Sequence, residues 1–194
     1  MLPESPPLPI TVDPLPYETR LEARALSQID LVVIHCTELP DMALARSYGE
    51  RELYASGTGN SGHYYIDRDG AVHQYVAPQR VAHHVRGHNA RAIGIELVNT
   101  GRYPHWHDSR HQAMAEPYPD AQIDALIALL RQLRAQLPSL HRIAGHEDLD
   151  TDTAPASDDP QAQVRRKRDP GPMFPWSRVL EAVDLERLGA PPPA

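Results

Sequence analysis

The sequence lacks the features that mark several classes of protein. It has one cysteine, Cys36, among 194 residues, so an intrachain disulfide is impossible and a reducing compartment is favoured. Residues 1–7 carry no basic side chain and no apolar run, so no signal peptide is expected. No apolar stretch is long enough to span a bilayer. These absences predict a cytoplasmic protein that does not enter the membrane.

Positive charge is also scarce. The chain has 19 Lys and Arg residues against 26 Asp and Glu residues, a formal net charge of −7. An acidic chain is a poor candidate for binding nucleic acid or an anionic membrane, and neither is expected as a partner. The exception is the run of four cations at 165–168. Such a run is often a solvated loop, although its arginines could also attract substrate carboxylates.

Local catalytic motifs are missing as well. There is no His-Glu-x-x-His helix and no pair of Cys-x-x-Cys motifs, so a metal site would have to gather its ligands from distant segments. Ser61, Ser109 and Ser139 stand in no nucleophile-elbow context. Cys36 adjoins His35, but neighbours on one strand point to opposite faces, so this pair is not expected to act together.

The pattern of apolar residues predicts one α/β domain. Proline-rich residues 1–18 indicate an extended N-terminal arm, and residues 19–190 a single domain. Helices are expected at 19–28, 42–55, 123–137 and 176–188. Strands are expected at 31–35, 63–67, 71–76, 92–98 and 141–145. Long loops are expected at 99–119 and 151–163, and a short tail at 191–193. This order predicts a mixed central β-sheet flanked by helices.

Four residues stand out as candidates for chemistry. His35 and His146 each end an apolar, strand-like segment, where side chains can converge at one edge of a sheet. Each histidine taken alone, and Asp169 taken alone, is more often structural. Two histidines and a carboxylate together would make a zinc site with a vacant position, as a hydrolase needs. Glu96 interrupts an apolar strand, which favours a functional group over a solvent-facing position on an edge strand.

The ordered set of motifs is more specific than any one of them. It comprises Val33-Ile34-His35-Cys36-Thr37, Gly62 to Gly70, Val81-Ala82-His83-His84, Asn89 to Leu97, Ala144-Gly145-His146 and Lys167 to Pro172. In this order the motifs cover residues 30–176. The pattern resembles the zinc-dependent N-acetylmuramoyl-L-alanine amidases of the type 2 family, which includes the AmpD-type recycling amidases and the peptidoglycan recognition proteins.

The resemblance implies a role for each matching residue. It implies a Zn²⁺ held by His35, His146 and Asp169, with Glu96 and Lys167 as catalytic residues. It also implies that His84 and Asn89 line the substrate groove. The expected reaction is hydrolysis of the amide between the lactyl group of N-acetylmuramic acid and L-alanine, in peptidoglycan or in muropeptides.

The expected protein is therefore a monomeric, cytoplasmic amidase domain that recycles soluble peptidoglycan fragments. One alternative is a non-catalytic peptidoglycan-binding module on the same fold, and another is a secreted cell-wall lysin or toxin. The segment between His146 and Lys167 and the 99–119 loop are both longer than is usual in the family. Both would border the groove, so the choice between soluble fragments and polymeric wall stays open.

Overall fold

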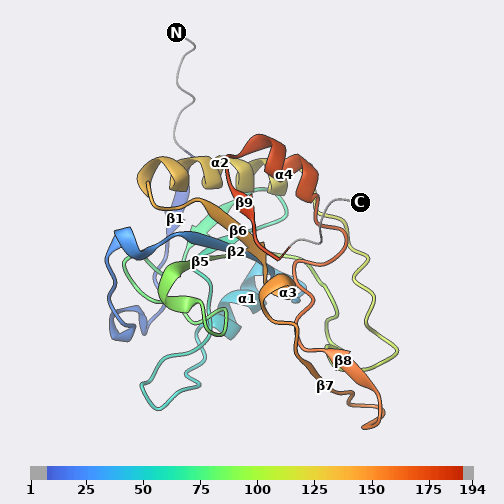
Figure 1. Ribbon diagram of the computed structural model, residues 1–194. Coiled ribbons are helices and arrows are strands. Elements are labelled where there is room, and N and C mark those ends of the chain that lie inside the picture. Colours follow the sequence, from blue (N-terminus) through green and yellow to red (C-terminus); the bar gives the residue numbers. More distant parts are fainter. Residues whose placement is uncertain (1–7, 190–194) are drawn as a thin grey trace.

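A seven-stranded mixed β-sheet forms the centre of the molecule (Figure 1). The protein is described by a computed structural model covering residues 8–189. The strand order is β1-β4-β3-β5-β2-β6-β9, with β3 and β4 antiparallel and all other neighbours parallel. The strands are β1 Ile10–Val12, β2 Leu31–Cys36, β3 Tyr64–Ile66, β4 Val72–Gln74, β5 Ala92–Leu97, β6 Arg142–Gly145 and β9 Glu186–Arg187.

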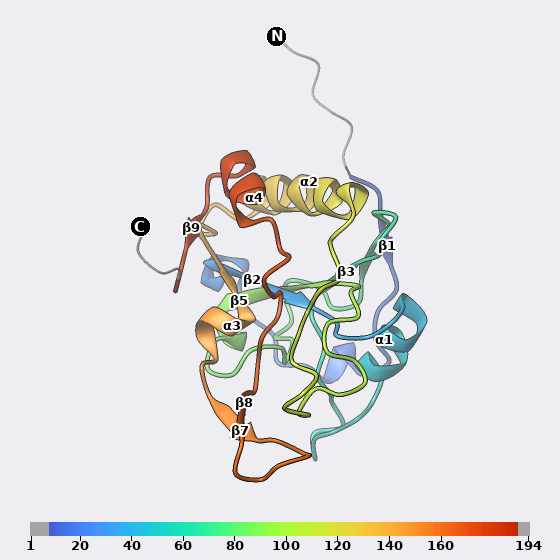
Figure 2. The same cartoon turned by 90° about the vertical axis from the view of Figure 1, so that its right-hand side faces the viewer.

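Helices lie on both sides of this sheet. The long helix α2 (Asp120–Gln136) and the shorter α4 (Trp176–Ala182) cover one face, as Figure 2 shows. Helices α1 (Met42–Gly49) and α3 (His146–Leu149) lie on the opposite side. The predicted α/β fold is thus confirmed. No helix within residues 8–189 combines the length and the apolar character needed to cross a bilayer.

The alternation of side chains along β2 decides which residues face the helices. Val32 and Ile34 belong to the large apolar cluster that includes α2, whereas Leu31 and Val33 belong to a smaller cluster on the other face. Since strand side chains alternate with period two, His35 must share the face of Leu31 and Val33. The side chain of His35 therefore points away from α2.

Helix α2 matches its prediction closely. Its apolar stripe, Ile123, Leu126, Ile127, Leu130 and Leu133, is buried against the sheet. The helix ends at Gln136, just before Pro138, because proline disfavours the helical conformation of the residue that precedes it and cannot donate a helical hydrogen bond. The strands predicted at 31–35, 63–67, 71–76, 92–98 and 141–145 are also present, with ends shifted by at most two residues.

The helix predicted at 19–28 is wrong. The segment contains two short 3-10 turns, Glu18–Arg20 and Leu26–Gln28, separated by extended backbone. Arg24 explains the extended part, because its guanidinium is buried and donates to the carbonyl oxygens of Pro78 (2.8 Å) and Ala92 (2.9 Å). These tertiary hydrogen bonds hold the chain against the sheet in place of a helix.

Two other helices are shorter than predicted. Helix α1 begins at the predicted cap, where the Asp41 side chain accepts from the backbone N–H of Leu44 at 2.7 Å, but it ends at Gly49. Glycine is a poor helix former, which explains the early end. Helix α4 ends at Ala182, and the chain then forms β9, whose Glu186 N–H donates to the carbonyl of His141 at 2.9 Å. Pairing with β6 replaces the last predicted turns.

The predicted N-terminal arm contains a strand, β1, that belongs to the sheet. Of the predicted N-terminal arm, residues 8–18 run along the sheet: β1 pairs with β4, and Leu15 and Tyr17 are buried. Residues 1–7 and the predicted tail at 191–193 lie outside the described residues.

The predicted loop at 151–163 includes β7 (Thr153–Pro155), which pairs with β8 (Gln163–Arg165) as a small hairpin (Figure 1). The 99–119 segment is a loop, as predicted.

Candidate metal centre and active site

One row of residues crosses the sheet at the carboxyl ends of its central parallel strands. His35 on β2 is the register partner of Glu96 on β5, and Glu96 is in turn the partner of Tyr65 on β3. On the other side of β2, strand β6 ends at Gly145, so the next residue, His146, comes level with His35. The carboxyl ends of parallel strands are a common place for binding sites, and here they collect the candidate residues.

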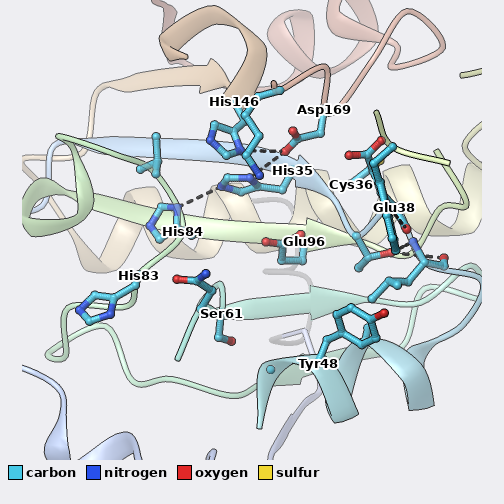
Figure 3. Close-up of a pocket in the computed structure, with 18 of the residues that line it drawn as sticks. His35, Cys36, Glu38, Tyr48, Ser61, His83, His84, Glu96, His146 and Asp169 are labelled. Carbon is cyan, nitrogen blue, oxygen red and sulfur yellow. Dashed lines mark hydrogen bonds and ion pairs between the residues drawn. The ribbon is translucent and has the colours of Figure 1, made fainter. Parts of the chain in front are cut away.

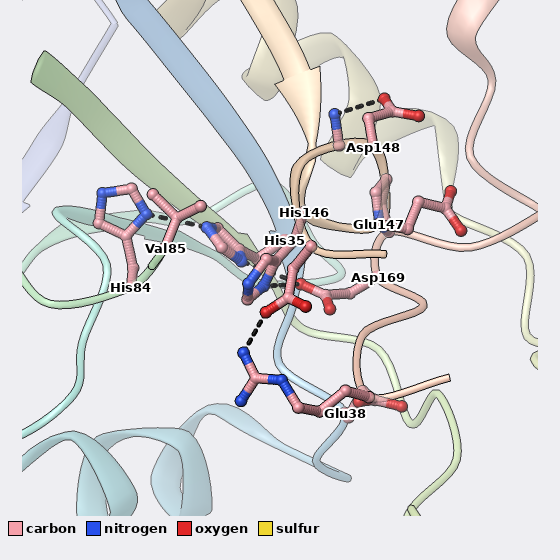
Figure 4. A network of polar contacts seen from close by, with 12 residues as sticks. His35, Glu38, His84, Val85, His146, Glu147, Asp148 and Asp169 are labelled. Carbon is pink, nitrogen blue, oxygen red and sulfur yellow. Dashed lines mark hydrogen bonds and ion pairs between the residues drawn. The ribbon is translucent and has the colours of Figure 1, made fainter. Parts of the chain in front are cut away.

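The predicted metal ligands lie together. Asp169 Oδ2 is 2.9 Å from His35 Nδ1 and 3.1 Å from His146 Nδ1. Figure 4 shows the three side chains turned toward one another. The three side chains are buried, and each offers a ligand atom within 4.8 Å of the others. Two imidazole nitrogens and one carboxylate oxygen form a donor set typical of a catalytic zinc site. The residues present therefore fit the metal that the sequence predicted.

The protonation states of this group also suit a cation. Burial lowers the pKa of His35 to about 4, although Asp169 opposes the shift. Burial alone would raise the pKa of Asp169, but the charge of His146 and the hydrogen bonds from His146 and His35 hold it well below its usual range. His35 is thus neutral and Asp169 ionised at neutral pH, and these are the forms that bind metals.

His84 contacts the other side of the His35 ring. Its Nδ1 lies 3.0 Å from His35 Nε2, and its ring packs on Gly94, where an added Cβ would come within 2.7 Å. A metal held by His35 through Nδ1 would leave the proton of the neutral ring on Nε2, from which it would be donated to His84 Nδ1. Such a contact orients a metal-binding histidine. His84 also lines the cavity, where its predicted contact with substrate stays a prediction.

Asn89 holds the loop that carries His84. Its Oδ1 accepts from the backbone N–H groups of His84 (3.0 Å) and Val85 (2.8 Å). Asn89 also borders the cavity, so it is placed where the resemblance implied, and its contact with substrate stays a prediction. The structure also gives this side chain a structural role, because its two hydrogen bonds fix the backbone at His84 and Val85.

Glu96 points into the cavity beside His35 (Figure 3). Burial and the negative charge of Asp169 raise its pKa well above the ordinary value, while Lys167 opposes the shift. Strand β5 lies between β3 and β2, so the alternative of a solvent-facing edge strand is wrong. Gly62 packs on the side chain, since a Cβ there would lie 2.8 Å from Glu96 Cγ. The site thus contains a carboxyl group suited to proton transfer.

The basic run at 165–168 is largely engaged with the rest of the fold. Arg165 donates to the backbone carbonyl of Glu147 at 2.8 Å, and Arg166 pairs with Asp150. These contacts dock the run against α3, the helix that begins with a predicted ligand. The view of the run as a solvated loop is therefore wrong for these two arginines. Lys167 lines the cavity, as its predicted role requires.

The row of candidate residues lies in an open cavity of about 740 Å³. The 99–119 loop borders it through Trp106 and His107, and Arg166 and Lys167 line it just after the β7–β8 hairpin. No residue of the predicted 151–163 loop lines it, so the expectation that both loops border the groove is met by the first loop alone. Its remaining lining includes residues that sequence reasoning did not select, namely Glu38, Tyr48, Tyr54 and Arg102. Glu38 and Arg102 form a buried ion pair between positions 64 residues apart, and such a pair leaves no local pattern in a sequence.

Known proteins are similar to this chain in sequence and in fold. A family model described as N-acetylmuramoyl-L-alanine amidase matches residues 25–172. The 1,6-anhydro-N-acetylmuramyl-L-alanine amidase AmpD of Enterobacter cloacae is 35% identical over 122 residues, covering 58% of this chain and 51% of AmpD. The N-acetylmuramoyl-L-alanine amidase AmiD of Escherichia coli is 29% identical over 194 residues, covering 91% of this chain and 60% of AmiD. The chain thus spans less than two thirds of either relative.

A solved structure of Escherichia coli AmiD has the same fold. It superposes with a TM-score of 0.60 at 27% identity, covering 84% of this chain and 61% of that one. That structure is a complex with the substrate anhydro-N-acetylmuramic acid-L-Ala-D-γ-Glu-L-Lys. The family match covers more than half of the chain and includes His35, Glu96, His146, Lys167 and Asp169. The chain therefore belongs to the N-acetylmuramoyl-L-alanine amidase family.

Proposed function

We propose that this protein is a zinc-dependent amidase that separates N-acetylmuramic acid from L-alanine in peptidoglycan fragments. One observation carries the proposal: His35, His146 and Asp169 converge within 4.8 Å in a cavity that also contains Glu96. The relatives support the reaction, because AmpD and AmiD are both named as amidases of muramoyl-L-alanine. In a member of that family, this constellation is the natural candidate for the catalytic centre.

Hydrolysis of an amide needs an activated water, a stabilised oxyanion and a proton for the leaving amine. His35, His146 and Asp169 would hold the zinc, which, when bound, supplies a Lewis acid and an acidified water ligand. Glu96 would accept the water's proton, which its raised pKa favours, and later donate it to the alanine nitrogen. Lys167 would place its positive charge beside the developing oxyanion.

Soluble fragments are the proposed substrates. The AmpD relatives are named for 1,6-anhydro-muramyl compounds, and the solved AmiD complex contains one. A cavity of about 740 Å³ has the size of a site for a small molecule. We also propose a cytoplasmic location, which the lone free cysteine and the acidic charge of the chain support. The fully assembled ligand set argues against a module that only binds.

Digestion of two substrates, followed by mass spectrometry, tests the proposal. The zinc-loaded protein is incubated with a soluble anhydro-muramyl tripeptide and with intact sacculi, each with and without a chelator. We expect the soluble compound to split into anhydro-muramic sugar and free peptide, and the chelator to stop the reaction. Binding without cleavage would support the binding module. Faster cleavage of sacculi than of the soluble compound would support a wall lysin.

A further inference from the structure

A buried arginine in the 99–119 loop takes part in no function described so far. The Arg102 side chain is only 1% exposed and lies beside Glu38, the first acidic residue after β2. Arg102 Nε donates to Glu38 Oε1 at 2.7 Å, and its Nη2 donates to Oε2 at 2.9 Å. This two-point pairing fixes the orientation of the guanidinium plane.

The remaining donors of Arg102 reach two other segments. Its Nη1 donates to Gln112 Oε1 at 3.1 Å and to the carbonyl of Arg165 at 2.9 Å. Its Nη2 also donates to the carbonyl of Arg166 at 3.4 Å. A guanidinium has five N–H bonds, and here every one has an acceptor. Arg102 therefore joins the end of β2, its own loop and the backbone at 165–166.

The two carbonyls that Arg102 contacts come directly before Lys167. On the other side of the chain, the Arg165 side chain donates to Glu147 O, and Arg166 pairs with Asp150. The backbone at 165–166 is thus held from both sides. Lysine is a point charge on a flexible stem, so the place that its ammonium can reach depends on where its backbone starts.

The metal ligand of the same segment has separate attachments. The Asp169 carbonyl accepts from the backbone N–H of Glu147 at 2.9 Å, and its carboxylate contacts His35 and His146. None of these contacts involves Arg102. A substitution at Arg102 should therefore shift the backbone of Lys167 while leaving the three metal ligands in place.

We propose that Arg102, oriented by Glu38, is a positioning residue that sets the backbone from which Lys167 acts. The inference rests on the proposed role of Lys167 in hydrolysis. It also gives the long 99–119 loop a part in the reaction, because this loop carries Arg102 and the Gln112 that supports it. Lysine cannot replace Arg102, since three donors on one nitrogen cannot reach all of these acceptors.

The test compares Arg102→Lys with a matched control, Arg68→Lys. Arg68 anchors the same loop through Glu116 at 2.7 Å and also donates to Pro40 O at 2.7 Å, but it does not contact residues 165–166. We expect Arg102→Lys to lower kcat about 10- to 100-fold per zinc-loaded molecule, with KM changed less than about 3-fold. The control should keep kcat within about 2-fold, because Arg68 does not contact the segment that carries Lys167. Unchanged kcat in Arg102→Lys would overturn the proposal.

A double-mutant comparison asks whether the effect passes through Lys167. In the Lys167→Ala background, Arg102→Lys should lower kcat by less than about 3-fold, since coupled residues are not additive. An undiminished effect in that background, or loss of zinc from Arg102→Lys itself, would contradict a positioning role. If Arg102→Lys does not fold, Glu38→Gln replaces it, and a folded Glu38→Gln protein with wild-type kcat would equally refute the idea.

Amide hydrogen exchange supplies a readout that needs no activity. Arg102→Lys should speed exchange in residues 163–168, while Arg68→Lys should leave that segment as in the wild type. Unchanged exchange in Arg102→Lys would show that the guanidinium does not hold the segment. A wild-type protein that cleaves no substrate would refute the proposed function alone, because the exchange experiment still reports on the contact.

Discussion

Replacement of Gly94 by alanine tests how the metal ligands are held. Gly94 lies on β5, two residues before Glu96, and its face of the sheet is covered by the imidazole of His84. A Cβ at this position would lie 2.7 Å from both Cγ and Nδ1 of that ring. Since that distance is far below van der Waals contact, the ring must move. Its 3.0 Å contact with His35 Nε2 would then be lost.

Two costs follow from this displacement. Inserting a methyl group into a packed site costs about 1–3 kcal/mol of stability. Loss of the contact that orients a metal-binding histidine weakens metal affinity by about 10- to 100-fold. Gly94→Ala should therefore unfold at lower denaturant concentration and bind zinc more weakly, although no predicted ligand has been changed.

Denaturant unfolding and zinc competition with a chelator measure the two effects separately. Gly49→Ala is the matched control, because a Cβ there would meet its nearest atom, Leu15 Cδ2, at an ordinary 3.5 Å. This helical glycine should accept alanine with unchanged zinc affinity and a gain of up to about 1 kcal/mol. If Gly94→Ala matches the wild type in both assays, the packing of His84 does not orient His35 and this part of the account fails.

Three further predictions concern separate parts of the molecule. Glu96→Gln should retain zinc yet lose at least about 100-fold in kcat, since general acid–base catalysis contributes that much; near-normal turnover would remove Glu96 from the reaction. Burial alone would raise the pKa of Asp30, but its hydrogen bond and ion pair with Arg91 lower it, so the stability from this pair is present above the unfolded pKa of about 3.9 and is lost as the pH falls. The difference in urea midpoint between wild type and Asp30→Asn should thus be largest near pH 6 and shrink as the pH is lowered below about 3.9; a constant difference would contradict the assignment. Leu126→Ala should cost about 2–5 kcal/mol in denaturant unfolding, because the side chain is fully buried under the sheet, and a smaller loss would mean that the core relaxes around the cavity.

Elements with a long hydrophobic period were predictable from the sequence. The stripe that begins at Ile123 and the continuous apolar runs of β2 and β5 report burial directly, and the structure has a helix and two central strands there. Short elements were not predictable in this way. Strand β9 has two residues and exists because β6 offers an open edge, so its cause lies more than 40 residues earlier in the chain.

In the candidate site, too, some features were predictable from the sequence and others were not. The sequence placed His35 and His146 at the ends of strands, and parallel pairing of β2 with β6 then brings them together with Asp169. The contacts that surround the ligands depend on tertiary structure. Gly94 reads as a small residue in an apolar strand, and only the fold reveals the imidazole of His84 packed on it.

Titration of the metal-free protein with zinc, with release of the peptide product followed at each point, tests the central claim most directly. The account predicts that cleavage of anhydro-muramyl peptide rises in proportion to added zinc and stops rising at one equivalent per chain, and that Asp169→Ala shows no such rise. Full cleavage by protein freed of zinc, or an unchanged titration in Asp169→Ala, would contradict it.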